Sequence, residues 1–207
     1  MTTAIIGLGN MGQGLARRLA GQTDLVLAAR NDAAAADLAA ALPGVLSASV
    51  DAAIARADIV ILAVGYDAAL ELAARPDLAG KIVVDITNPV TADFSGLRLG
   101  HTSSAAEEIQ KAAPEAKVVK AFNTIFAQVL QAGGKVADRP ATVFIAGDDP
   151  QARAAVADLA TKAGFETLET GGLASARLLE PLGMLNITLG YGLGLGTGIA
   201  PTWLRDA

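Results

Sequence analysis

Residues 1–32 read MTTAIIGLGNMGQGLARRLAGQTDLVLAARND, and they decide the fold. A short apolar run ends at Gly7 and a helical pattern begins near Met11, so Gly7-Leu8-Gly9-Asn10-Met11-Gly12 matches the GxGxxG fingerprint between a strand and a helix. The first glycine permits a tight turn, the second lets the backbone approach a pyrophosphate, and the third lets the helix pack on the strand. The backbone amides of Asn10 and Met11 would face the phosphates at the positive end of the helix. The segment therefore predicts a dinucleotide site.

Short aliphatic runs alternate with alanine-rich helical stretches along the chain, which is typical of parallel βαβ units. Most runs are apolar on both faces, as expected of central strands covered by helices above and below. The pattern predicts an α/β Rossmann-type fold, with a doubly wound parallel sheet of about eight strands and a C-terminal helical extension. The expected strands are Ala4–Gly7, Asp24–Ala29, Val45–Ala48, Ile59–Val64, Ile82–Ile86, Val118–Ala121, Ala141–Ala146 and Glu166–Glu169. The expected helices are Met11–Ala20, Asp32–Ala41, Asp51–Arg56, Asp67–Arg75, Ser104–Ala113, Pro150–Ala163 and Ala174–Leu189.

No proline-rich or glycine-rich linker divides the 207 residues, so we expect a single dinucleotide-binding domain. Its core is expected over residues 1–146, and residues 147–207 are expected to add a strand and helices. The stretch Gly190–Gly198 is apolar and glycine-spaced, and such a stretch is seldom stable when exposed. We therefore expect it to pack against a second subunit, in a homodimer, and to help enclose a pocket.

The composition argues against several classes of protein. The formal net charge of −5 disfavours a nucleic-acid binder, because phosphate backbones are held by basic surfaces. The chain has no cysteine, which excludes disulfides, thiolate metal sites and a cysteine nucleophile. The longest apolar tract, Leu182–Leu195, contains Asn186 and several glycines and is too short for a membrane span. The N-terminus lacks the basic start of a signal peptide, so we expect a cytoplasmic protein.

The end of the second expected strand indicates which dinucleotide is bound. An NAD enzyme normally presents an acidic residue to the ribose there, and neither Ala28 nor Ala29 is acidic. Arg30 instead supplies a permanently charged donor where the 2′-phosphate of NADP would lie, and Asn31 adds a neutral donor beside it. We therefore predict NADP(H) as the cofactor. The alternative is a solvated arginine next to Asp32.

Further candidates follow the later strands at the same edge of the sheet, where ligands bind in this fold. Tyr66 would either cover the dinucleotide or cap the helix beginning at Asp67. The polar groups after the fifth and sixth strands are candidates to orient the nicotinamide carboxamide or to line a substrate pocket, although such residues often only satisfy turns. The cofactor-site candidates here are Ala63, Val64, Tyr66, Asn88 and Pro89. The pocket candidates are Asn123, Thr124 and Lys120, and Lys120, Arg98 and Arg139 are available for an anionic acceptor.

Familiar catalytic groups are missing from the sequence. His101 is the only histidine, and a solvated loop position suits it better than a ligand role. No GxSxG elbow or Walker loop is present, and Gly147-Asp148-Asp149-Pro150 fits a capped turn into a helix better than a metal site. We therefore name no catalytic residue and expect no metal.

With these residues assembled, the chain resembles the deazaflavin-dependent NADP oxidoreductases, which exchange hydride between NADP(H) and coenzyme F420. It is also similar to the NADPH-oxidising domains of the STEAP metalloreductases, whose electrons pass through a flavin. Both resemblances imply a flavin-shaped acceptor, such as coenzyme F420, FMN or FAD. The match runs nearly end to end and includes Gly7–Gly12 with Asn10, Arg30, Tyr66, Pro89-Val90, Thr124-Ile125, Gly147-Asp148-Asp149 and Ala176-Arg177-Leu178-Leu179-Glu180.

Two departures from that family concern the ligands. Ala29-Arg30-Asn31 stands where the family tends to carry a Ser-Arg-Arg cluster, and Asn123 stands where it has a histidine. The resulting prediction is an NADP(H)-dependent oxidoreductase that passes a hydride to a flavin or deazaflavin, mainly by holding the two rings together. Two alternatives are a non-catalytic dinucleotide-sensing module and a reductase of a small imine or hydroxyacid. The imine and hydroxyacid enzymes need a large helical second domain, for which this chain has too few residues.

Overall fold

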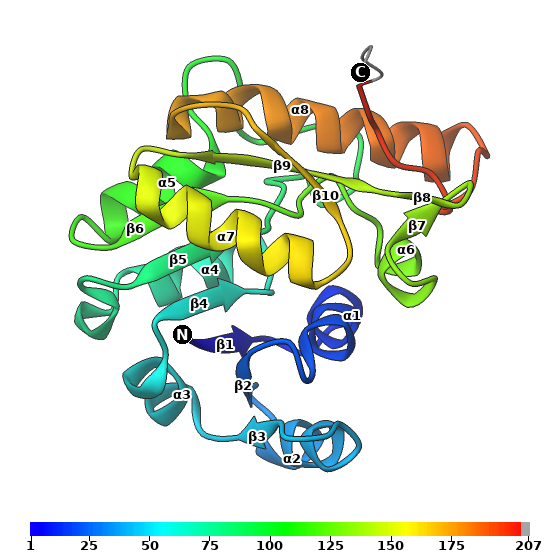
Figure 1. The fold of residues 1–207 in the computed structure, drawn as a ribbon. Coiled ribbons are helices and arrows are strands. Elements are labelled where there is room, and N and C mark those ends of the chain that lie inside the picture. The colour runs from blue at the N-terminus through cyan, green and yellow to red at the C-terminus, as the bar shows by residue number, and fades with distance from the viewer. Residues whose placement is uncertain (204–207) are drawn as a thin grey trace.

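The computed structural model describes residues 1–203. Eight strands form one sheet in the order β10-β9-β6-β5-β4-β1-β2-β3 (Figure 1). Strands β1 to β6 are parallel to one another, and β1 lies between β2 and β4, where a doubly wound sheet reverses its direction of growth. The predicted α/β Rossmann-type fold is confirmed. The strands are β1 (Thr2–Ile6), β2 (Asp24–Ala28), β3 (Leu46–Ser47), β4 (Ile59–Leu62), β5 (Ile82–Asp85), β6 (Lys117–Lys120), β9 (Thr142–Gly147) and β10 (Glu166–Glu169).

The last two strands correct the expectation of a wholly parallel sheet. β9 pairs antiparallel with β6, and β10 pairs parallel with β9. A parallel neighbour usually follows a crossover helix, whereas the segment between β6 and β9 holds only α6 (Ala127–Gln131) and a hairpin of β7 (Lys135–Val136) and β8 (Arg139–Pro140). The hairpin turns through Ala137 and Asp138, both with positive φ, as in a type I′ turn. The usual Asn-Gly signal of such a turn is absent, so the hairpin could not be predicted from the residues at the turn.

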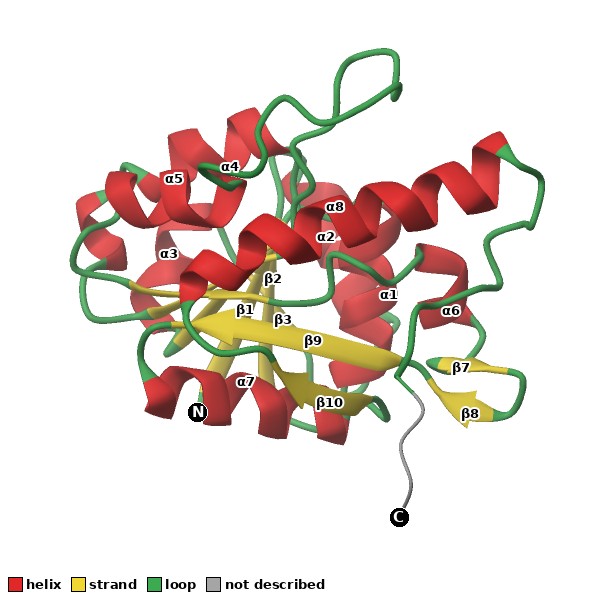
Figure 2. Ribbon diagram, turned by 90° about the horizontal axis from the view of Figure 1, so that it is seen from above, coloured by secondary structure: helices red, strands yellow, loops and turns green. Residues whose placement is uncertain are grey.

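The helices cover both faces of the sheet. On one face, α1, α6 and α7 pack their apolar sides against residues such as Ile5 and Ile145, and on the other face α3, α4 and α5 pack against residues such as Ile6 and Val83. The last helix, α8, packs through Leu179 on Phe144 of β9, on the side of β9 away from α7 (Figure 1). Figure 2 looks down on α8 and shows it crossing over β9. The helices are α1 (Asn10–Leu19), α2 (Asp32–Ala40), α3 (Val50–Arg56), α4 (Tyr66–Ala73), α5 (Ala105–Ala112), α7 (Pro150–Lys162) and α8 (Ala176–Ile187), with a π-helical turn over Thr188–Gly192.

Side-chain caps explain where several helices begin. Asn31 accepts a hydrogen bond from the backbone N–H of Ala34 at the start of α2, as expected. Asp149 accepts one from Ala152 and precedes Pro150 at the first position of α7, which confirms the capped turn predicted there.

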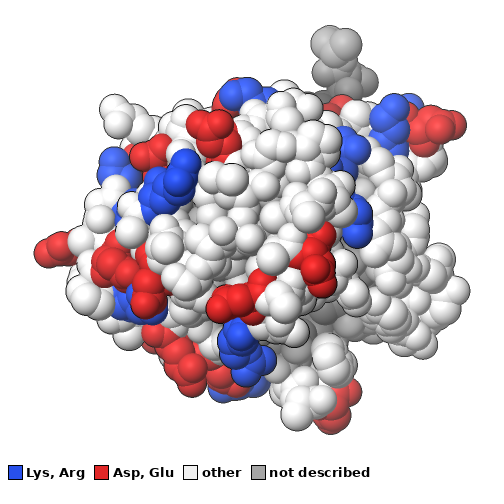
Figure 3. Space-filling model, turned by 90° about the horizontal axis from the view of Figure 1, so that it is seen from below, with Lys and Arg blue, Asp and Glu red and all other residues white. Residues whose placement is uncertain are grey.

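The face of the molecule at the bottom of Figure 1 carries charges of both signs. Figure 3 shows acidic and basic side chains intermixed on this face, with no continuous basic area. Within residues 1–203, no helix is long and apolar enough to cross a lipid bilayer.

Candidate functional site

The turn between β1 and α1 has the geometry of a phosphate-binding loop. Gly7 has φ +100°, and a Cβ there would lie 2.5 Å from the carbonyl oxygen of Ala63. A Cβ on Gly12 would lie 1.9 Å from the carbonyl oxygen of Gly7, so the close contact between turn and helix requires both glycines. A Cβ on Gly9 would meet nothing within 4 Å, because Gly9 faces open space. The second glycine of the fingerprint therefore lies where a ligand can approach the backbone.

The first backbone N–H groups of α1 are available to that ligand. The helix begins at Asn10 after Gly9, and no side chain caps it. Its first hydrogen bond runs from the N–H of Gln13 to the carbonyl of Gly9, so the preceding amides have no acceptor among residues 1–203. Unpaired amides and the helix dipole together favour a bound anion. Leu8 packs against the core beside this turn.

The chain end of β2 presents Arg30 to solvent. Arg30 is exposed, and no described carboxylate forms an ion pair with it, Asp32 included. Asn31 is exposed beside it but uses its side-chain oxygen to cap α2. The guanidinium of Arg30 is thus free to meet a phosphate, while only the amide nitrogen of Asn31 is.

Tyr66 is the first residue of α4. Gly65 is the N-cap and no side chain caps the helix, so the alternative in which Tyr66 serves as a cap is wrong. The Arg98 guanidinium lies 5.2 Å from the centre of the Tyr66 ring and forms a 2.9 Å ion pair with Asp67. Burial raises the pKa of Tyr66, with Glu108 adding to the effect, and the bond from Arg98 lowers the pKa of Asp67. Arg98 is therefore engaged with α4, although it was expected to be available to an acceptor.

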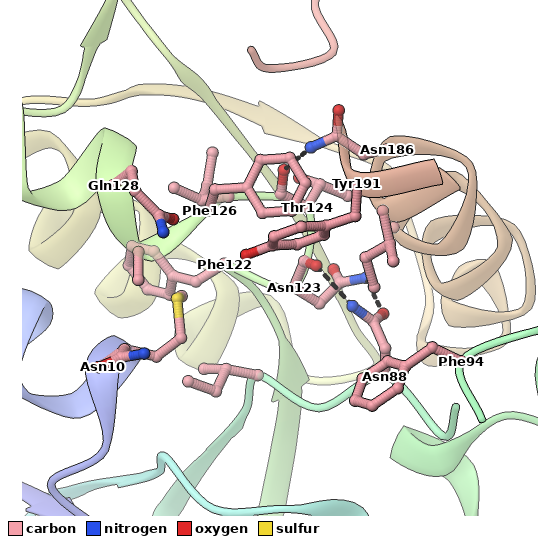
Figure 4. A pocket seen from close by; sticks show the side chains of 16 residues that line it. Asn10, Asn88, Phe94, Phe122, Asn123, Thr124, Phe126, Gln128, Asn186 and Tyr191 are labelled. Atoms are coloured by element: carbon pink, nitrogen blue, oxygen red, sulfur yellow. Dashed lines mark hydrogen bonds between the residues drawn. The ribbon is translucent and has the colours of Figure 1, made fainter. Parts of the chain in front are cut away.

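A cavity of about 580 Å³ adjoins the turn and shares Asn10 and Met11 with it (Figure 4). Of the described side chains that line it, none is charged, and Tyr191 is the only one that can titrate. Figure 4 shows Asn10 on one side of the cavity and Asn88 and Phe94 on the other. The lining residues are Asn10, Met11, Ile86, Asn88, Phe94, Phe122, Asn123, Thr124, Ile125, Phe126, Ala127, Gln128, Gly183, Asn186, Ile187 and Tyr191.

An amide pair of Asn88 and Asn123 forms part of this lining. The Asn123 Nδ2 donates to Asn88 Oδ1 at 2.9 Å and to the carbonyl of Leu179 at 2.8 Å, while Asn88 Nδ2 donates to the carbonyl of Asn123 at 2.8 Å. Two acceptors around one nitrogen fix which way the Asn123 amide points. Its Oδ1 atom is buried and has no hydrogen-bond partner within the described chain.

Thr124 supplies a second buried oxygen without a partner. Its backbone carbonyl accepts a 3.1 Å hydrogen bond from Asn186 of α8, and its Oγ1 has no partner among the described residues. Thr124 is 2% exposed and Asn123 is 6% exposed. Buried polar atoms in native proteins nearly always find partners, so these two oxygens, on residues that line the cavity, are unusual; Thr87 Oγ1, outside the lining, is a third such atom in the described chain.

Lys120 lies in a different place from the one expected. It is fully buried, and its Nζ donates to Asp85 at 2.8 Å and to Glu180 at 2.8 Å, without lining the cavity. Glu180 also accepts from the backbone N–H groups of Ala105 and Ala106, at the start of α5. Burial raises the pKa of Glu180. Lys120 therefore joins β5, β6 and α8, and the expectation that it binds an acceptor is wrong.

The outer candidates do not reach the cavity either. Arg139 is exposed on the β7–β8 hairpin, and His101 is exposed in the loop before α5. Pro89 is buried. Ala63 and Val64, which directly follow β4, lie against Gly7 in the glycine turn. Within residues 1–203, no three His, Asp or Glu side chains are grouped to hold a metal ion.

One wall of the cavity comes from α8 and was missed. The buried face of this helix carries Glu180, Gly183 and Asn186 at a spacing of three, and it turns polar or small groups toward the ends of β5 and β6. A Cβ on Gly183 would lie 2.7 Å from Asn88 Oδ1 and 3.0 Å from the Asn123 carbonyl, so this glycine lets the helix approach the amide pair. That spacing within an otherwise apolar helix was a readable signal.

Comparison with known proteins agrees with this geometry. The family described as "NADP oxidoreductase coenzyme F420-dependent" matches residues 2–89. An F420-dependent NADP reductase of Methanocaldococcus jannaschii is 30% identical over 99% of this chain and 100% of its own length, and that of Methanothermobacter thermautotrophicus is 32% identical over 91% and 89%. A crystal structure from Arthrobacter sp. FB24, of a protein assigned as an F420-dependent NADP reductase, has 32% identity and a TM-score of 0.86, over 99% of this chain and 100% of that one.

The STEAP metalloreductases are a second group of relatives. Metalloreductase STEAP3 of Rattus norvegicus is 37% identical over 86% of this chain, but the match spans only 35% of the STEAP3 length. The chain thus corresponds to about a third of that relative. An NADPH-bound reductive aminase of Aspergillus terreus, 24% identical with a TM-score of 0.68 over 93% of this chain and 62% of that one, shares the fold.

Proposed function

We infer the function from one premise: this chain belongs to the family of coenzyme F420-dependent NADP oxidoreductases. We propose that it transfers a hydride between NADP(H) and a flavin or deazaflavin ring held in the cavity beside the glycine turn. The observation that carries the proposal is the cavity itself: its described lining is uncharged, it adjoins the N-terminus of α1, and it is lined by Asn123 and Thr124, each with a buried oxygen that has no partner among residues 1–203.

The residues around the turn fit an NADP dinucleotide. The open side of Gly9 gives the pyrophosphate access to the backbone, and the unpaired amides at the start of α1 would bind its oxygens. Arg30, exposed and without an ion-pair partner in the described part of the chain, would bind the 2′-phosphate, with the amide nitrogen of Asn31 beside it. Tyr66, backed by Arg98, would cover the dinucleotide from the side of α4. The bound cofactor supplies the hydride from its nicotinamide ring.

The cavity fits the two rings that must meet. Asn123 Oδ1 can only accept, so the group that meets it must be an N–H or O–H donor, such as a carboxamide or a ring N–H. The Thr124 hydroxyl can donate and accept beside it. Fixed partners of this kind align a ring, and the apolar side chains around them exclude water. Alignment of the reacting rings lowers the barrier by removing the entropy cost of bringing them together.

Among residues 1–203, no acid–base pair lines the cavity, and direct hydride transfer requires none. Asp85, Lys120 and Glu180 are buried and bonded to one another, so their task is to hold α8 against the sheet. A proton for the acceptor is supplied from solvent in this proposal. Asn88, fixed by Asn123, closes the cavity on the side of β5.

The proposal is tested by following NADPH oxidation with coenzyme F420, FMN, FAD, a quinone and a small cyclic imine in parallel. We expect turnover with the deazaflavin or a flavin, and none with the imine. Turnover with the imine alone would favour the alternative of a small-substrate reductase. Tight NADPH binding without oxidation by any acceptor would favour a non-catalytic dinucleotide-sensing module.

We also propose that the protein is a homodimer. Leu193 and Leu195 of the C-terminal glycine-rich stretch are 70% and 60% exposed, and Leu185 of α8 is 53% exposed. Exposed apolar side chains grouped in this way are typical of an interface between subunits. Light scattering at micromolar concentration should give the mass of two chains, and the mass of one chain would contradict the proposal.

A further inference from the structure

Two exposed aromatic side chains line the cavity from segments far apart in the sequence. Phe94, in the loop between β5 and α5, is 62% exposed, and Tyr191, in the π-helical turn after α8, is 65% exposed. Aromatic rings are normally well buried, because they carry a large apolar area. Two rings left open to solvent at one cavity therefore require a reason.

Phe94 is held outward by a hydrogen-bonded turn. Its φ is +57°, which is unfavourable for a bulky side chain. Asp93 Oδ1 accepts from the Thr91 hydroxyl at 2.6 Å and from the Ser95 hydroxyl and backbone N–H at 2.8 and 3.1 Å. These bonds lower the pKa of Asp93 to about 2, so the carboxylate stays charged, and keeps its hydrogen bonds, at a more acidic pH than an ordinary aspartate would. The turn thus maintains an otherwise unfavourable exposure of Phe94.

The loop that carries Phe94 is tied to the side of the dinucleotide. The N–H of Arg98 donates to the carbonyl of Pro89 at 2.7 Å, and Val90 bridges to Leu97, which closes the base of the loop. The Arg98 guanidinium then stacks on Tyr66 and pairs with Asp67 at the start of α4. The position of Phe94 is therefore set relative to the segment that would cover the cofactor.

Tyr191 forms an edge-to-face pair with Phe126 and is still 65% exposed. Its ring meets Phe126 at 5.5 Å and 85°. A Cβ on Gly190 would lie 2.9 Å from the Phe126 ring, so this glycine allows the π-helical turn to approach Phe126. Turns of this kind are frequent at functional sites. Figure 4 shows the Tyr191 ring extending among the lining side chains, with Phe94 at the edge beside Asn88.

We infer that Phe94 and Tyr191 determine the acceptor specificity of this site, by holding a planar, fused-ring acceptor between their ring faces. The inference rests on the proposed function and deepens it. The two rings offer contact to any flat aromatic surface, and the uncharged lining disfavours a charged group at the reacting end. A small imine or carbonyl compound would leave both rings wet, whereas a fused-ring acceptor would cover them. Tyr191 acts through its ring, and its hydroxyl is not required.

The test uses riboflavin as a probe, titrated by fluorescence quenching into the full chain saturated with NADP⁺. Phe94→Ala and Tyr191→Ala should each weaken riboflavin roughly 3- to 10-fold, the usual range for one aromatic contact. Tyr191→Phe and Phe94→Tyr, which keep the rings, should bind like the parent protein. Leu178→Ala, a change at an apolar residue that is 73% exposed and lies outside both the cavity lining and the proposed subunit interface, is the matched control. NADPH affinity should stay the same in all five variants, which shows that they are folded.

Several results would overturn the inference. These are a parent protein that does not bind riboflavin, alanine variants that bind it as well as the parent, or a Tyr191→Phe variant as weak as Tyr191→Ala. A shift from dimer to monomer in the alanine variants with unchanged riboflavin affinity would assign the rings to a contact between two copies instead. Riboflavin binding that depends on both rings, without NADPH oxidation by any flavin or deazaflavin, would support the inference and contradict only the proposed function.

Discussion

Replacing Gly183 by alanine tests whether α8 and the amide pair form one unit. A Cβ there would lie 2.7 and 2.8 Å from the two side-chain atoms of Asn88 and 3.0 Å from the carbonyl of Asn123. The backbone carbonyl cannot yield easily, so Asn88 has to move and lose its two hydrogen bonds with Asn123. That loss costs about 2 kcal/mol at about 1 kcal/mol per bond. Alanine inside a helix returns about 1 kcal/mol relative to glycine.

The net expectation is a destabilisation of about 1 kcal/mol, or a fall in Tm of about 2–4 °C for a chain of this length. Gly192→Ala is the matched control, because a Cβ there meets only the Thr188 Cγ2 at an ordinary 3.8 Å. Both variants are measured by urea and thermal unfolding, and then by KM for NADPH and for the acceptor. Gly183→Ala should raise at least one KM, since Asn123 Oδ1 loses its fixed direction. Equal or higher stability for Gly183→Ala than for Gly192→Ala, with unchanged kinetics, would refute the reasoning.

Three further predictions concern the dinucleotide and the pH dependence of stability. Gly9→Val should abolish NADPH binding, measured by fluorescence titration, while circular dichroism stays unchanged, because the new side chain fills open space where the pyrophosphate is expected. Arg30→Ala should weaken NADPH affinity by about one to two orders of magnitude, because a hydrogen bond to a charged group contributes about 1.5–3 kcal/mol. NADH affinity, measured by the same calorimetry, should not change, and Arg56→Ala is the control. Equal losses of affinity for both cofactors would contradict a phosphate contact. The pKa of Glu107 is lowered mainly by the hydrogen bonds from Arg177, so the stability that this pair contributes is present above about pH 4.3 and is lost as the pH falls through the lowered pKa. The unfolding free energies of the parent protein and Glu107→Gln should therefore converge in acid. A constant difference between the two at every pH would argue against the pair.

The sequence was most informative where function depends on local backbone geometry. The glycine turn could be predicted because Gly7 and Gly12 are required by close contacts within a few residues or with the segment after the adjoining strand, where a Cβ would clash. The central strands β1, β4 and β5 were equally readable, since burial on both faces makes them almost uniformly apolar. The direction of β9 was not predicted, yet the absence of a long helical pattern between residues 122 and 140 already argued against a parallel crossover.

Side chains whose role depends on distant partners were the part that sequence could not supply. Lys120 reads as a solvated base at the end of a strand, and only the fold brings it to Asp85 and Glu180, 35 and 60 residues away. Asn123, predicted as a pocket residue, lines the cavity, but its unpaired oxygen follows from bonds to Asn88 and Leu179 that no spacing reveals. Phe94 reads as one more apolar residue in a loop. Its exposure depends on a turn that is held by hydrogen bonds among Thr91, Asp93 and Ser95. Only these neighbouring polar side chains could have been noticed in the sequence.

The buried contact among Asp85, Lys120 and Glu180 has a consequence for the order of events during synthesis. Two of its members leave the ribosome with β5 and β6, and the third follows with α8, close to the end of the chain. Until α8 arrives, the ammonium group and the first amides of α5 keep water at this edge, because burying them without Glu180 would leave polar groups unpaired. We therefore expect the nascent chain to form the sheet around β1 early and to close the wall of its cavity only after α8 has left the ribosome. A chain that stops before residue 176 should remain hydrated and open to proteases at the ends of β5 and β6.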